Sequence, residues 1–386
     1  MSSGAGSGRR PYRHRRLVGV VLAIAWIALL LAPGVSAQNA VEVPDVSAGS
    51  VFAFDPATGE VILERNGHER RLIGSVVKIA TALVVVDQLD LDEEIVIASA
   101  DMVRPSFSAM GLQPGDTLTV RQLLTGLLVT SGGDSANALA REVGTRLSGS
   151  HDPATAVAAF VEAMNARVAE IGLTDTQFAN PDGADADDSW STAHDVALMY
   201  ADLAANPVLA ELAALPDYAF TSVGPEETPY AGLSTNQLVG QYDVLSAKTG
   251  STEEAGGCLV FARSMPGGGG TEIVAILGAD LAYDKIWTPT VDARWNDAIA
   301  VMEAIDADWT PGQNLPAAIS TEAPVVAAAS ENLQAQPQPE PFELTETDRS
   351  ARAGSGPEPL LVVTLASGVL ATAGILAWSR VAPRRI

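Results

Sequence analysis

Two long apolar runs, one near each end of the chain, limit how much of it can fold as a water-soluble unit. Residues 17–32 contain no charged side chain, and Pro33 and Gly34 interrupt the run before small residues lead to Ala37. Five arginines precede this run: Arg9, Arg10, Arg13, Arg15 and Arg16. A basic segment, an apolar segment and small residues in this order are typical of a secretion signal. We therefore predict a signal peptide over residues 1–37, cleaved after Ala37; an uncleaved N-terminal anchor is the alternative.

The second apolar run covers residues 360–378 and contains no charge. As a helix it would span about 28 Å, which is close to the hydrocarbon thickness of a bilayer. Arginines follow at positions 380, 384 and 385, and basic residues beside a span favour the cytoplasmic side. We predict a transmembrane helix over 360–378, rather than an amphipathic core helix, and a cytoplasmic tail over 379–386. The protein is then expected in the cell membrane as a single-pass protein whose functional domain is extracellular.

Composition divides the chain between these runs into two parts. Residues 50–309 have the patterning of a folded domain, and hydrophobic residues make up 47% of the whole sequence, which is enough for a core. From residue 310 to 359, Pro, Ala, Gln and Glu dominate, and neither a helical nor a strand period is visible. We predict that residues 50–309 form the functional domain and that residues 310–359 form a disordered stalk.

The charge balance excludes several classes of protein. The chain has 47 acidic and 23 basic residues, a formal net charge of −24 and a pI near 4.4, so nucleic acid is not expected as a partner. All acidic residues lie between the two apolar runs, which argues against membrane attachment through a basic face. A single cysteine, Cys258, excludes an internal disulfide framework, and four scattered histidines give no support for a metal centre. No metal or cofactor is expected.

Local patterns in the domain predict an α+β fold. Two strand-like segments, 50–55 and 60–64, flank a Pro-Ala-Thr-Gly turn and should form a hairpin. Residues 75–89 are apolar on almost every side, so we expect a buried helix there. The other expected elements are helices over 120–129, 134–147, 154–171 and 192–204, strands over 257–263 and 272–277, and a final helix over 291–305. This order predicts one main antiparallel sheet with a block of helices.

Two of the chain's three lysines stand in a chemically informative context, and the first is in Ser75-Val-Val-Lys78. The spacing places a hydroxyl and an amine on one face of the expected buried helix. A lysine buried there has a lowered pKa and can accept the serine proton, which is the activation that a nucleophilic serine needs. A Ser-x-x-Lys pattern alone is common, so this hypothesis needs a second motif.

The second motif is Lys248-Thr249-Gly250, which we place just before the predicted strand pair. The alternative interpretation of Lys248 is a solvated surface lysine. However, every basic residue except Lys78, Lys248 and Lys285 is arginine, and arginine cannot give up its proton at working pH. A lysine in such a chain therefore indicates a position where the amine itself is needed. Lys285 has no interpretation of this kind.

Together the two motifs resemble those of serine-type D-Ala-D-Ala carboxypeptidases, which are low-molecular-mass penicillin-binding proteins with a β-lactamase-like fold. The segments that fit lie between about residues 50 and 305: Asp55-x-x-Thr58-Gly59, Gly74-Ser75-Val-Val-Lys78, Leu123-Leu-x-Gly-Leu-Leu128, Ser131-Gly132, Phe178-x-Asn180-Pro181-x-Gly183, Ser191-Thr192-Ala193-x-Asp195 and Lys248-Thr249-Gly250. The resemblance implies that Ser75 forms an acyl-enzyme, that Lys78 is its base and that Ser131 relays protons. Lys248, with Thr249 and Gly250, would bind the terminal carboxylate of the substrate. The implied partners are peptidoglycan stem peptides, with β-lactams as covalent inhibitors.

The sequence departs from the family's pattern at one position. Where the family usually has Ser-Gly-Asn-Asp, this chain has Ser131-Gly132-Gly133-Asp134. Asn137 lies one helical turn later and is an alternative source of the missing amide, although a structural role on its helix is the simpler interpretation. Loss of one polar contact costs about 1–3 kcal/mol, or roughly one to two orders of magnitude in rate. We therefore expect weakened activity or an altered substrate preference.

Other functions share part of this pattern. A D,D-endopeptidase would use the same residues, and a catalytically impaired wall-binding protein would follow from the missing asparagine. No Gly-x-Ser-x-Gly elbow is present, and His68, His151 and His194 lack the spacing of a zinc peptidase. No glutamate matches the deacylating residue of a β-lactamase, so penicillin is expected to acylate Ser75 and to leave slowly. Cys258 is interpreted as a small buried hydrophobic residue.

Overall fold

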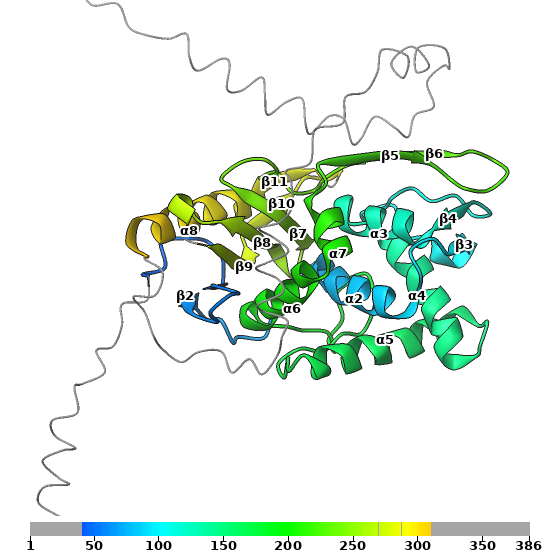
Figure 1. The fold of residues 1–386 in the computed structure, drawn as a ribbon, viewed down its shortest axis with the longest axis horizontal. Helices are drawn as coiled ribbons and strands as arrows, with labels where there is room; N and C mark the ends of the chain where they lie inside the picture. The colour runs from blue at the N-terminus through cyan, green and yellow to red at the C-terminus, as the bar shows by residue number, and fades with distance from the viewer. Residues whose placement is uncertain (1–40, 269, 287, 310–386) are drawn as a thin grey trace, which may run out of the picture. The chain divides into compact units, whose positions relative to one another are not determined.

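The structure, a computed structural model, describes residues 41–309 apart from residues 269 and 287 (Figure 1). The predicted signal peptide, stalk, transmembrane helix and cytoplasmic tail lie outside these residues. Among the residues that are described, no single helix has the length and apolar character needed to cross a membrane. The helices Ala193–Ala205 and Pro207–Ala214 are long and apolar enough only when they are counted together, and the chain bends by 106° between them.

A five-stranded antiparallel sheet forms the centre of the domain, in the strand order β2-β1-β9-β8-β7. Its strands are β1 (Ser50–Phe54), β2 (Val61–Arg65), β7 (Val244–Thr252), β8 (Gly256–Ser264) and β9 (Thr271–Ala279). Strands β1 and β2 pair as the predicted hairpin, and Gly59 adopts a φ of 74° in the turn, a left-handed conformation that favours glycine. The predicted pairing of the two later strands, β8 and β9, is also confirmed.

The sheet is covered on both faces, which explains why its inner strands are apolar throughout. In β9, Ile273, Ala275 and Leu277 face the larger core, which they share with the block of helices. Val274 and Ile276 face the opposite way, into a smaller core completed by the last helix, α8. A shift of one residue in pairing would exchange the two sets of side chains, so this two-sided burial fixes the register.

The block of helices packs around α2, the buried helix that carries the first lysine (Figure 1). The helices of this block are α2 (Lys78–Gln88), α3 (Val120–Val129), α4 (Gly133–Ser148), α5 (Pro153–Glu170), α6 (Ala193–Ala205) and α7 (Pro207–Ala214), whereas α8 (Arg294–Asp308) packs on the other face of the sheet. Every residue of α2 from Lys78 to Val85 is buried, which confirms its predicted burial on all sides. Thr192 caps α6 by accepting a hydrogen bond from Asp195 N, and Thr119 forms a capping box with Gln122 at the start of α3.

Several short elements, like α7, were not predicted from the sequence. They are η1 (Gly74–Val77), η2 (Ser99–Asp101), η3 (Pro266–Gly268), and the two-stranded sheets β3–β4 (Glu94–Val96, Thr117–Thr119), β5–β6 (Asp217–Thr221, Pro229–Leu233) and β10–β11 (Leu281–Tyr283, Pro289–Asp292). Val291, predicted as the start of the last helix, belongs to β11, and α8 begins only at Arg294. That prediction was wrong because pairing with β10 overrides the local helical pattern.

Residues 41–49, which precede the predicted start of the domain, are also part of it. The Asp297 carboxylate of α8 accepts hydrogen bonds from Ser47 N at 3.2 Å and from Ser47 Oγ at 2.7 Å. Val41 and Trp309 are buried in the same core, the one that α8 completes. The first and last described residues of the domain therefore pack into one core.

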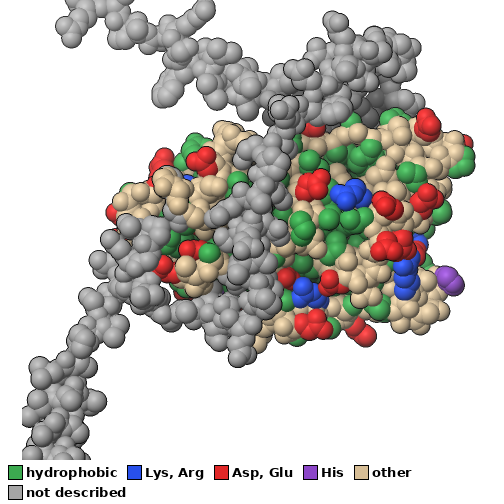
Figure 2. All heavy atoms as spheres, viewed as in Figure 1, with side chains coloured by type: hydrophobic (Ala, Val, Ile, Leu, Met, Phe, Trp, Pro, Cys, Tyr) green, Lys and Arg blue, Asp and Glu red, His purple; other side chains and the backbone are tan. Residues whose placement is uncertain are grey.

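The surface of the domain agrees with the acidic composition of the chain. Asp and Glu side chains are spread over the face drawn in Figure 2, with fewer Lys and Arg side chains between them. Acidic side chains spread in this way over a surface favour solubility.

Candidate active site

Ser75 lies in the 3-10 turn η1, immediately before α2, and not in the first turn of an α-helix as predicted. The turn continues directly into α2, whose first residue is Lys78. Gly74 adopts a φ of 52°, and a Cβ atom on it would lie 2.9 Å from the backbone nitrogen of Ser251. Glycine fits both this conformation and this close approach, so the turn that carries the serine can pack directly against β7.

Lys78 and Ser75 form the hydrogen-bonded pair that the Ser-x-x-Lys spacing predicts. Lys78 Nζ donates to Ser75 Oγ at 2.8 Å and also to the backbone oxygen of Asp182. Burial of Lys78 lowers the pKa of its amine to about 8, although the negative charges of Asp182 and Asp134 oppose this shift. A fraction of the amine is therefore neutral near pH 7 and can accept the Ser75 proton.

A second serine–lysine pair joins Ser131, which follows the C-cap residue of α3, to Lys248 in strand β7. Ser131 has a φ of 57°, which is uncommon for a residue other than glycine, and it is buried. Lys248 Nζ donates to Ser131 Oγ at 2.7 Å and to the backbone oxygen of Thr249 at 2.8 Å. Burial lowers the pKa of Lys248 well below its usual value, and the positive charges of Lys78 and Arg294 lower it further. The two pairs therefore lie within electrostatic reach of each other.

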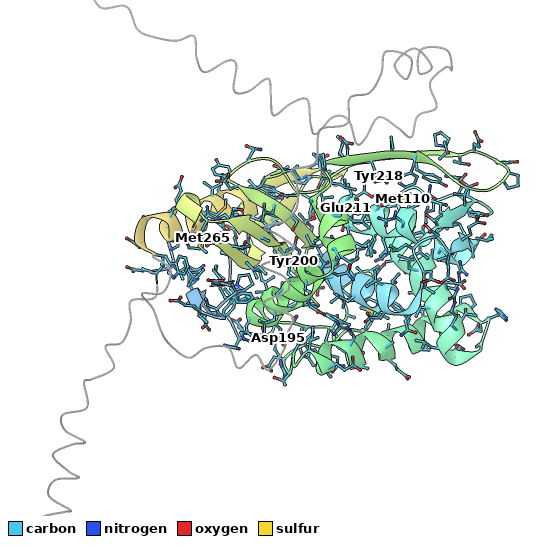
Figure 3. All side chains as sticks on the ribbon, in the orientation of Figure 1. Met110, Asp195, Tyr200, Glu211, Tyr218 and Met265 are labelled. Carbon is cyan, nitrogen blue, oxygen red and sulfur yellow. The ribbon has the colours of Figure 1, made fainter. Side chains whose placement is uncertain are left out.

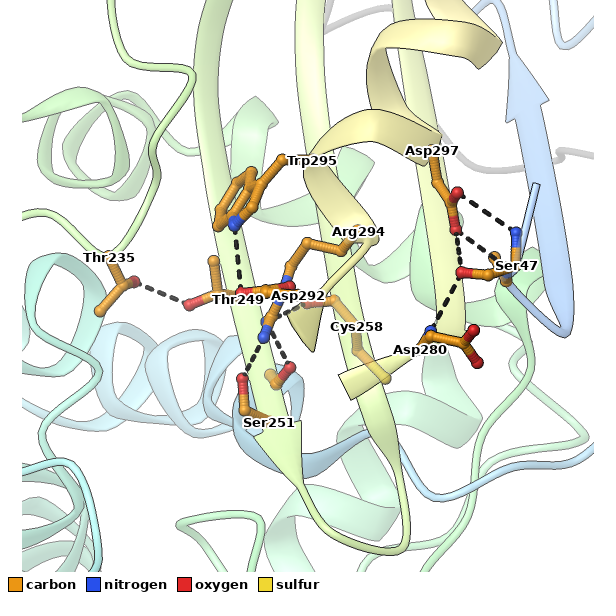
Figure 4. A network of polar contacts seen from close by, with 12 residues as sticks. Ser47, Thr235, Thr249, Ser251, Cys258, Asp280, Asp292, Arg294, Trp295 and Asp297 are labelled. Atoms are coloured by element: carbon orange, nitrogen blue, oxygen red, sulfur yellow. Dashed lines mark hydrogen bonds and ion pairs between the residues drawn. The ribbon is translucent and has the colours of Figure 1, made fainter. Parts of the chain in front are cut away.

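The Lys-Thr-Gly motif precedes the β8–β9 pair, as predicted, but it lies inside a further strand, β7, which was not predicted. β7 is an edge strand of the central sheet, hydrogen bonded to β8. Thr249 Oγ1 is hydrogen bonded to Thr235 Oγ1 at 2.7 Å (Figure 4). A Cβ atom on Gly250 would lie 2.2 Å from the backbone oxygen of Ile73, so glycine is required where the strand meets η1. All six residues predicted for the site are thus brought to one region, by η1, α2, the turn between α3 and α4, and β7.

Comparison with known proteins agrees with this geometry. The family model described as D-alanyl-D-alanine carboxypeptidase matches residues 37–280, which is more than half of the chain. The chain belongs to the D-alanyl-D-alanine carboxypeptidase family.

Individual relatives carry the names of several related activities. A D-alanyl-D-alanine carboxypeptidase of Mycobacterium tuberculosis is 32% identical over 236 residues, 60% of this chain and 76% of the relative. A D-alanyl-D-alanine carboxypeptidase of Streptomyces sp. strain K15 is 32% identical over 299 residues, 75% of this chain and 98% of the relative. A D-alanyl-D-alanine endopeptidase of Pseudomonas aeruginosa is 30% identical over 222 residues, 56% of this chain and 67% of the relative.

The fold also agrees with solved structures of the family. The crystal structure of the Streptomyces K15 DD-transpeptidase matches with a TM-score of 0.61 at 31% identity, over 68% of this chain and 98% of that chain. The α+β expectation is therefore confirmed as a penicillin-binding-protein-like fold, with an antiparallel sheet and helices. The protein is a serine hydrolase of the penicillin-binding kind.

In this carboxypeptidase, Asn137 does not supply the amide that the family's pattern has at position 133. Its Nδ2 donates to the backbone oxygen of Asp101 at 3.2 Å, which ties α4 to η2. The structural interpretation of Asn137 is therefore confirmed. Position 133 itself is the first residue of α4, two residues after Ser131.

The role of Asp134 was not foreseen from the sequence. Its carboxylate accepts hydrogen bonds from the backbone nitrogens of Met110 (2.8 Å), Gly111 (2.8 Å), Leu112 (3.0 Å) and Ser135 (2.9 Å). Figure 3 shows Met110 beside α3 and α4. A carboxylate in the first turn of α4 thus holds a distant loop against the helix next to the site. The only signal in the sequence was the position of this acidic residue directly after Ser131-Gly132-Gly133.

Arg294, the first residue of α8, is a second residue that the sequence did not single out. Its Nη1 donates to Gly250 O at 2.7 Å and to Cys258 O at 3.2 Å, and its Nη2 donates to Ser251 Oγ at 2.7 Å (Figure 4). Asp292 accepts from its Nε at 2.6 Å. Arg294 therefore fixes the backbone of β7 at the Lys-Thr-Gly motif. Arginine is the ordinary basic residue of this chain, so its identity gave no signal.

The remaining candidate residues stay outside the site. His194 Nδ1 lies 2.9 Å from Asp195 Oδ1, and its ring packs against that of His68. Within residues 41–309 as described, no group of three or more His, Cys, Asp or Glu side chains is arranged to hold a metal ion. Cys258 is buried, and burial raises the pKa of its thiol to about 11, which agrees with its interpretation as a small hydrophobic residue. Lys285 is exposed and has no role in the site.

Proposed function

We propose that the protein removes the terminal D-alanine from peptidoglycan stem peptides through an ester formed on Ser75. The observation that carries this proposal is the 2.8 Å hydrogen bond between the Ser75 hydroxyl and the buried amine of Lys78. Because the pKa of this amine is lowered to about 8, its neutral form is accessible near neutral pH. Lys78 then takes the proton as Ser75 Oγ attacks the carbonyl carbon of the penultimate D-alanine.

The proposed reaction has two steps. In acylation, the C–N bond to the terminal D-alanine breaks, the ester to Ser75 Oγ forms, and the proton held by Lys78 passes to the leaving amine, with the Ser131 hydroxyl as relay. In deacylation, water attacks the ester, the shortened peptide leaves as a carboxylic acid, and the proton lost by water returns to Ser75. No oxidant, reductant or cofactor enters either step.

Lys248 is proposed as the group that binds the terminal carboxylate of the substrate. Its amine is buried among other cations, which disfavours the charged form until an anion arrives. A substrate carboxylate supplies that anion, and the Thr249 hydroxyl offers a further donor. The carboxylate of a β-lactam has the same chemistry, so penicillins are proposed to acylate Ser75 and to remain bound as covalent inhibitors.

A D,D-endopeptidase is the second candidate, because a relative with that name is 30% identical to this chain. The two reactions share the acylation step and differ in the leaving group, which is free D-alanine in one and a cross-linked peptide in the other. The intact Ser75–Lys78 pair counts against a wall-binding protein without activity.

We also propose that the domain acts outside the cytoplasm and is held to the cell membrane by the segment 360–378. The support is the apolar and uncharged character of that segment together with the basic residues that follow it. Protease added to intact cells is expected to degrade the domain and to spare a tag placed after residue 386. Protection of the domain would contradict the proposed orientation.

Labelling with a fluorescent penicillin tests the catalytic assignment. We expect covalent labelling of the full-length wild type and none of Ser75→Ala, whereas Ser106→Ala, which changes an exposed serine, should label normally. Wild-type protein that is folded but takes no label would overturn the proposal. Release of D-alanine from a pentapeptide, compared with splitting of a cross-linked dimer, then separates the carboxypeptidase from the endopeptidase.

A further inference from the structure

Position 133, where this chain departs from its family's pattern, is bordered by a polar group from another part of the fold. A Cβ atom on Gly133 would lie 3.7 Å from Oδ2 of Asp182. It would also lie 3.0 Å from Val103 Cγ1 and 3.3 Å from the backbone oxygen of Ser108. A side chain at position 133 would therefore enter a space that the Asp182 carboxylate borders.

Hydrogen bonds within the loop between α5 and α6 fix the direction of the Asp182 side chain. Asp182 Oδ1 accepts from Ala184 N at 3.1 Å, while Asn180 accepts from Gly183 N at 2.8 Å and donates to Ala184 O at 2.8 Å. Gly183 has a φ of 83°, and a Cβ atom on it would lie 2.2 Å from Gly74 O, so the loop packs directly on η1. With Oδ1 engaged inside this loop, Oδ2 is the oxygen that faces position 133.

Asp182 is also the first of the carboxylates that act on Lys78. Its charge raises the pKa of Lys78 against the effect of burial, and Asp134 has a smaller effect in the same direction. The Asp134 carboxylate already accepts four backbone hydrogen bonds. Lys248 in β7 is a lysine like Lys78, so it cannot supply a negative charge that would stabilise the ammonium form of Lys78. Asp182 is therefore the acidic group that both borders position 133 and favours the ammonium form of Lys78.

We propose that Asp182 is a positioning residue for Lys78. The Asp182 carboxylate borders the space left open by Gly133, and it stabilises the lysine ammonium that forms when Ser75 is deprotonated. This inference rests on the proposed function, because Lys78 becomes protonated in the reaction only if it is the base. The family's pattern places a neutral amide at position 133 of α4, whereas here a charged group approaches from the loop between α5 and α6. The carboxylate makes Lys78 a stronger base and leaves less of it neutral at low pH.

Asp182→Asn tests the charge, because it keeps the size of the side chain and an oxygen for the Ala184 N–H. The acylation rate with a fluorescent penicillin is measured on the full-length protein as a function of pH. We expect the acidic limb of the profile to move to lower pH by about half a unit to one unit, and the plateau at high pH to fall. A change that is only structural would lower the rate at every pH without moving the limb.

Asp187→Asn is the matched control, since it removes an exposed carboxylate from the same loop; it should leave the limb in place. A folded Asp182→Asn protein whose limb stays in place, or moves to higher pH, would overturn the inference. Failure of the proposed function looks different, because the wild type then takes no label at any pH.

A double-mutant cycle tests the connection between positions 182 and 133. The amide of Gly133→Asn would have to enter the space that the Asp182 carboxylate borders, since a Cβ atom there lies 3.7 Å from Asp182 Oδ2, so we expect no gain in acylation rate from this substitution alone. In an Asp182→Ala background that space is free for the new amide, and the double variant should recover roughly tenfold of the lost rate. Additive effects of the two substitutions would refute a shared role for the two positions.

Discussion

The two serine–lysine pairs of the site have the same geometry in opposite electrostatic surroundings. In each, a buried lysine amine donates to a serine hydroxyl, at 2.8 Å from Lys78 to Ser75 and at 2.7 Å from Lys248 to Ser131. Burial lowers the pKa of both amines, but carboxylates oppose the shift at Lys78, whose pKa is about 8, whereas cations add to the shift at Lys248, whose pKa lies well below the usual value. The difference suggests how one motif can serve two purposes. A lysine with acidic neighbours can repeatedly gain and lose a proton, whereas a lysine among cations gains its charge when an anionic substrate arrives.

Replacing Lys78 by arginine should lower the rate of acylation more than replacing Lys248 or Arg294. A guanidinium keeps the positive charge but cannot act as a base. We expect the rate of acylation by penicillin to fall by about 10²- to 10⁴-fold. Lys285→Arg, which changes an exposed lysine, is the control and should react like the wild type. A folded Lys78→Arg protein that acylates at the normal rate would show that another group is the base.

Replacing Lys248 by glutamine should have a smaller effect of a different kind. The loss of a cation that binds a carboxylate costs about 1.5–3 kcal/mol, so we expect kcat/KM for a D-Ala-D-Ala peptide to fall by roughly 10- to 100-fold, mainly through KM. A peptide with a C-terminal amide lacks the carboxylate, and the variant should lose little against that substrate. Equal losses on both peptides would argue against a role in carboxylate binding.

The pH dependence of acylation in the wild type should report the protonation of Lys78. Lys78 acts as a base only when neutral, and the neutral form predominates above its pKa of about 8. Acylation should therefore rise by about tenfold per pH unit below that value and level off above it. Penicillin acylation followed across the range provides the test. A profile that is flat between pH 6 and pH 9 would contradict the assignment of Lys78.

Substitution of Arg294 should change the stability of the domain and have only a small effect on catalysis. The guanidinium is one of the cations near Lys248, and it holds β7 through Gly250 O and Ser251 Oγ. We expect Arg294→Gln to lower the free energy of unfolding by about 1.5–3 kcal/mol, which denaturant titration measures. Acylation should remain detectable, because Ser75 and Lys78 make no hydrogen bond to Arg294. Complete loss of labelling in a folded variant would mean that Arg294 has a direct part in the chemistry.

The parts of this site that could be predicted from the sequence are those with local signals. Ser75 and Lys78 are three residues apart, and the scarcity of lysine marked Lys248 without any knowledge of the fold. The helix over 120–129 was also predicted at its observed bounds, and its start carries a local signal, the capping box of Thr119 and Gln122.

The parts that could not be predicted depend on contacts between distant segments. Strand β7 was missed because its polar residues and glycine hide the strand pattern, which only pairing with β8 makes stable. Asp182 reaches Lys78 through a backbone oxygen, which no side-chain pattern reveals. The role proposed for Asp182 likewise depends on an approach between α4, at Gly133, and the loop between α5 and α6, which are far apart in the sequence.

The hydrogen bonds between Ser47 and Asp297, and the common core of Val41 and Trp309, mean that the domain is closed upon itself. New ends can therefore be opened elsewhere without uncovering this core. A circular permutant could join residue 309 to residue 41 by a linker and begin at the exposed tip between β5 and β6, around residues 225–227. Such a molecule would keep the same sheet and the same site while the proposed membrane tether would leave from another part of the surface. The place of attachment and the chemistry of the enzyme are thus separable properties of this fold.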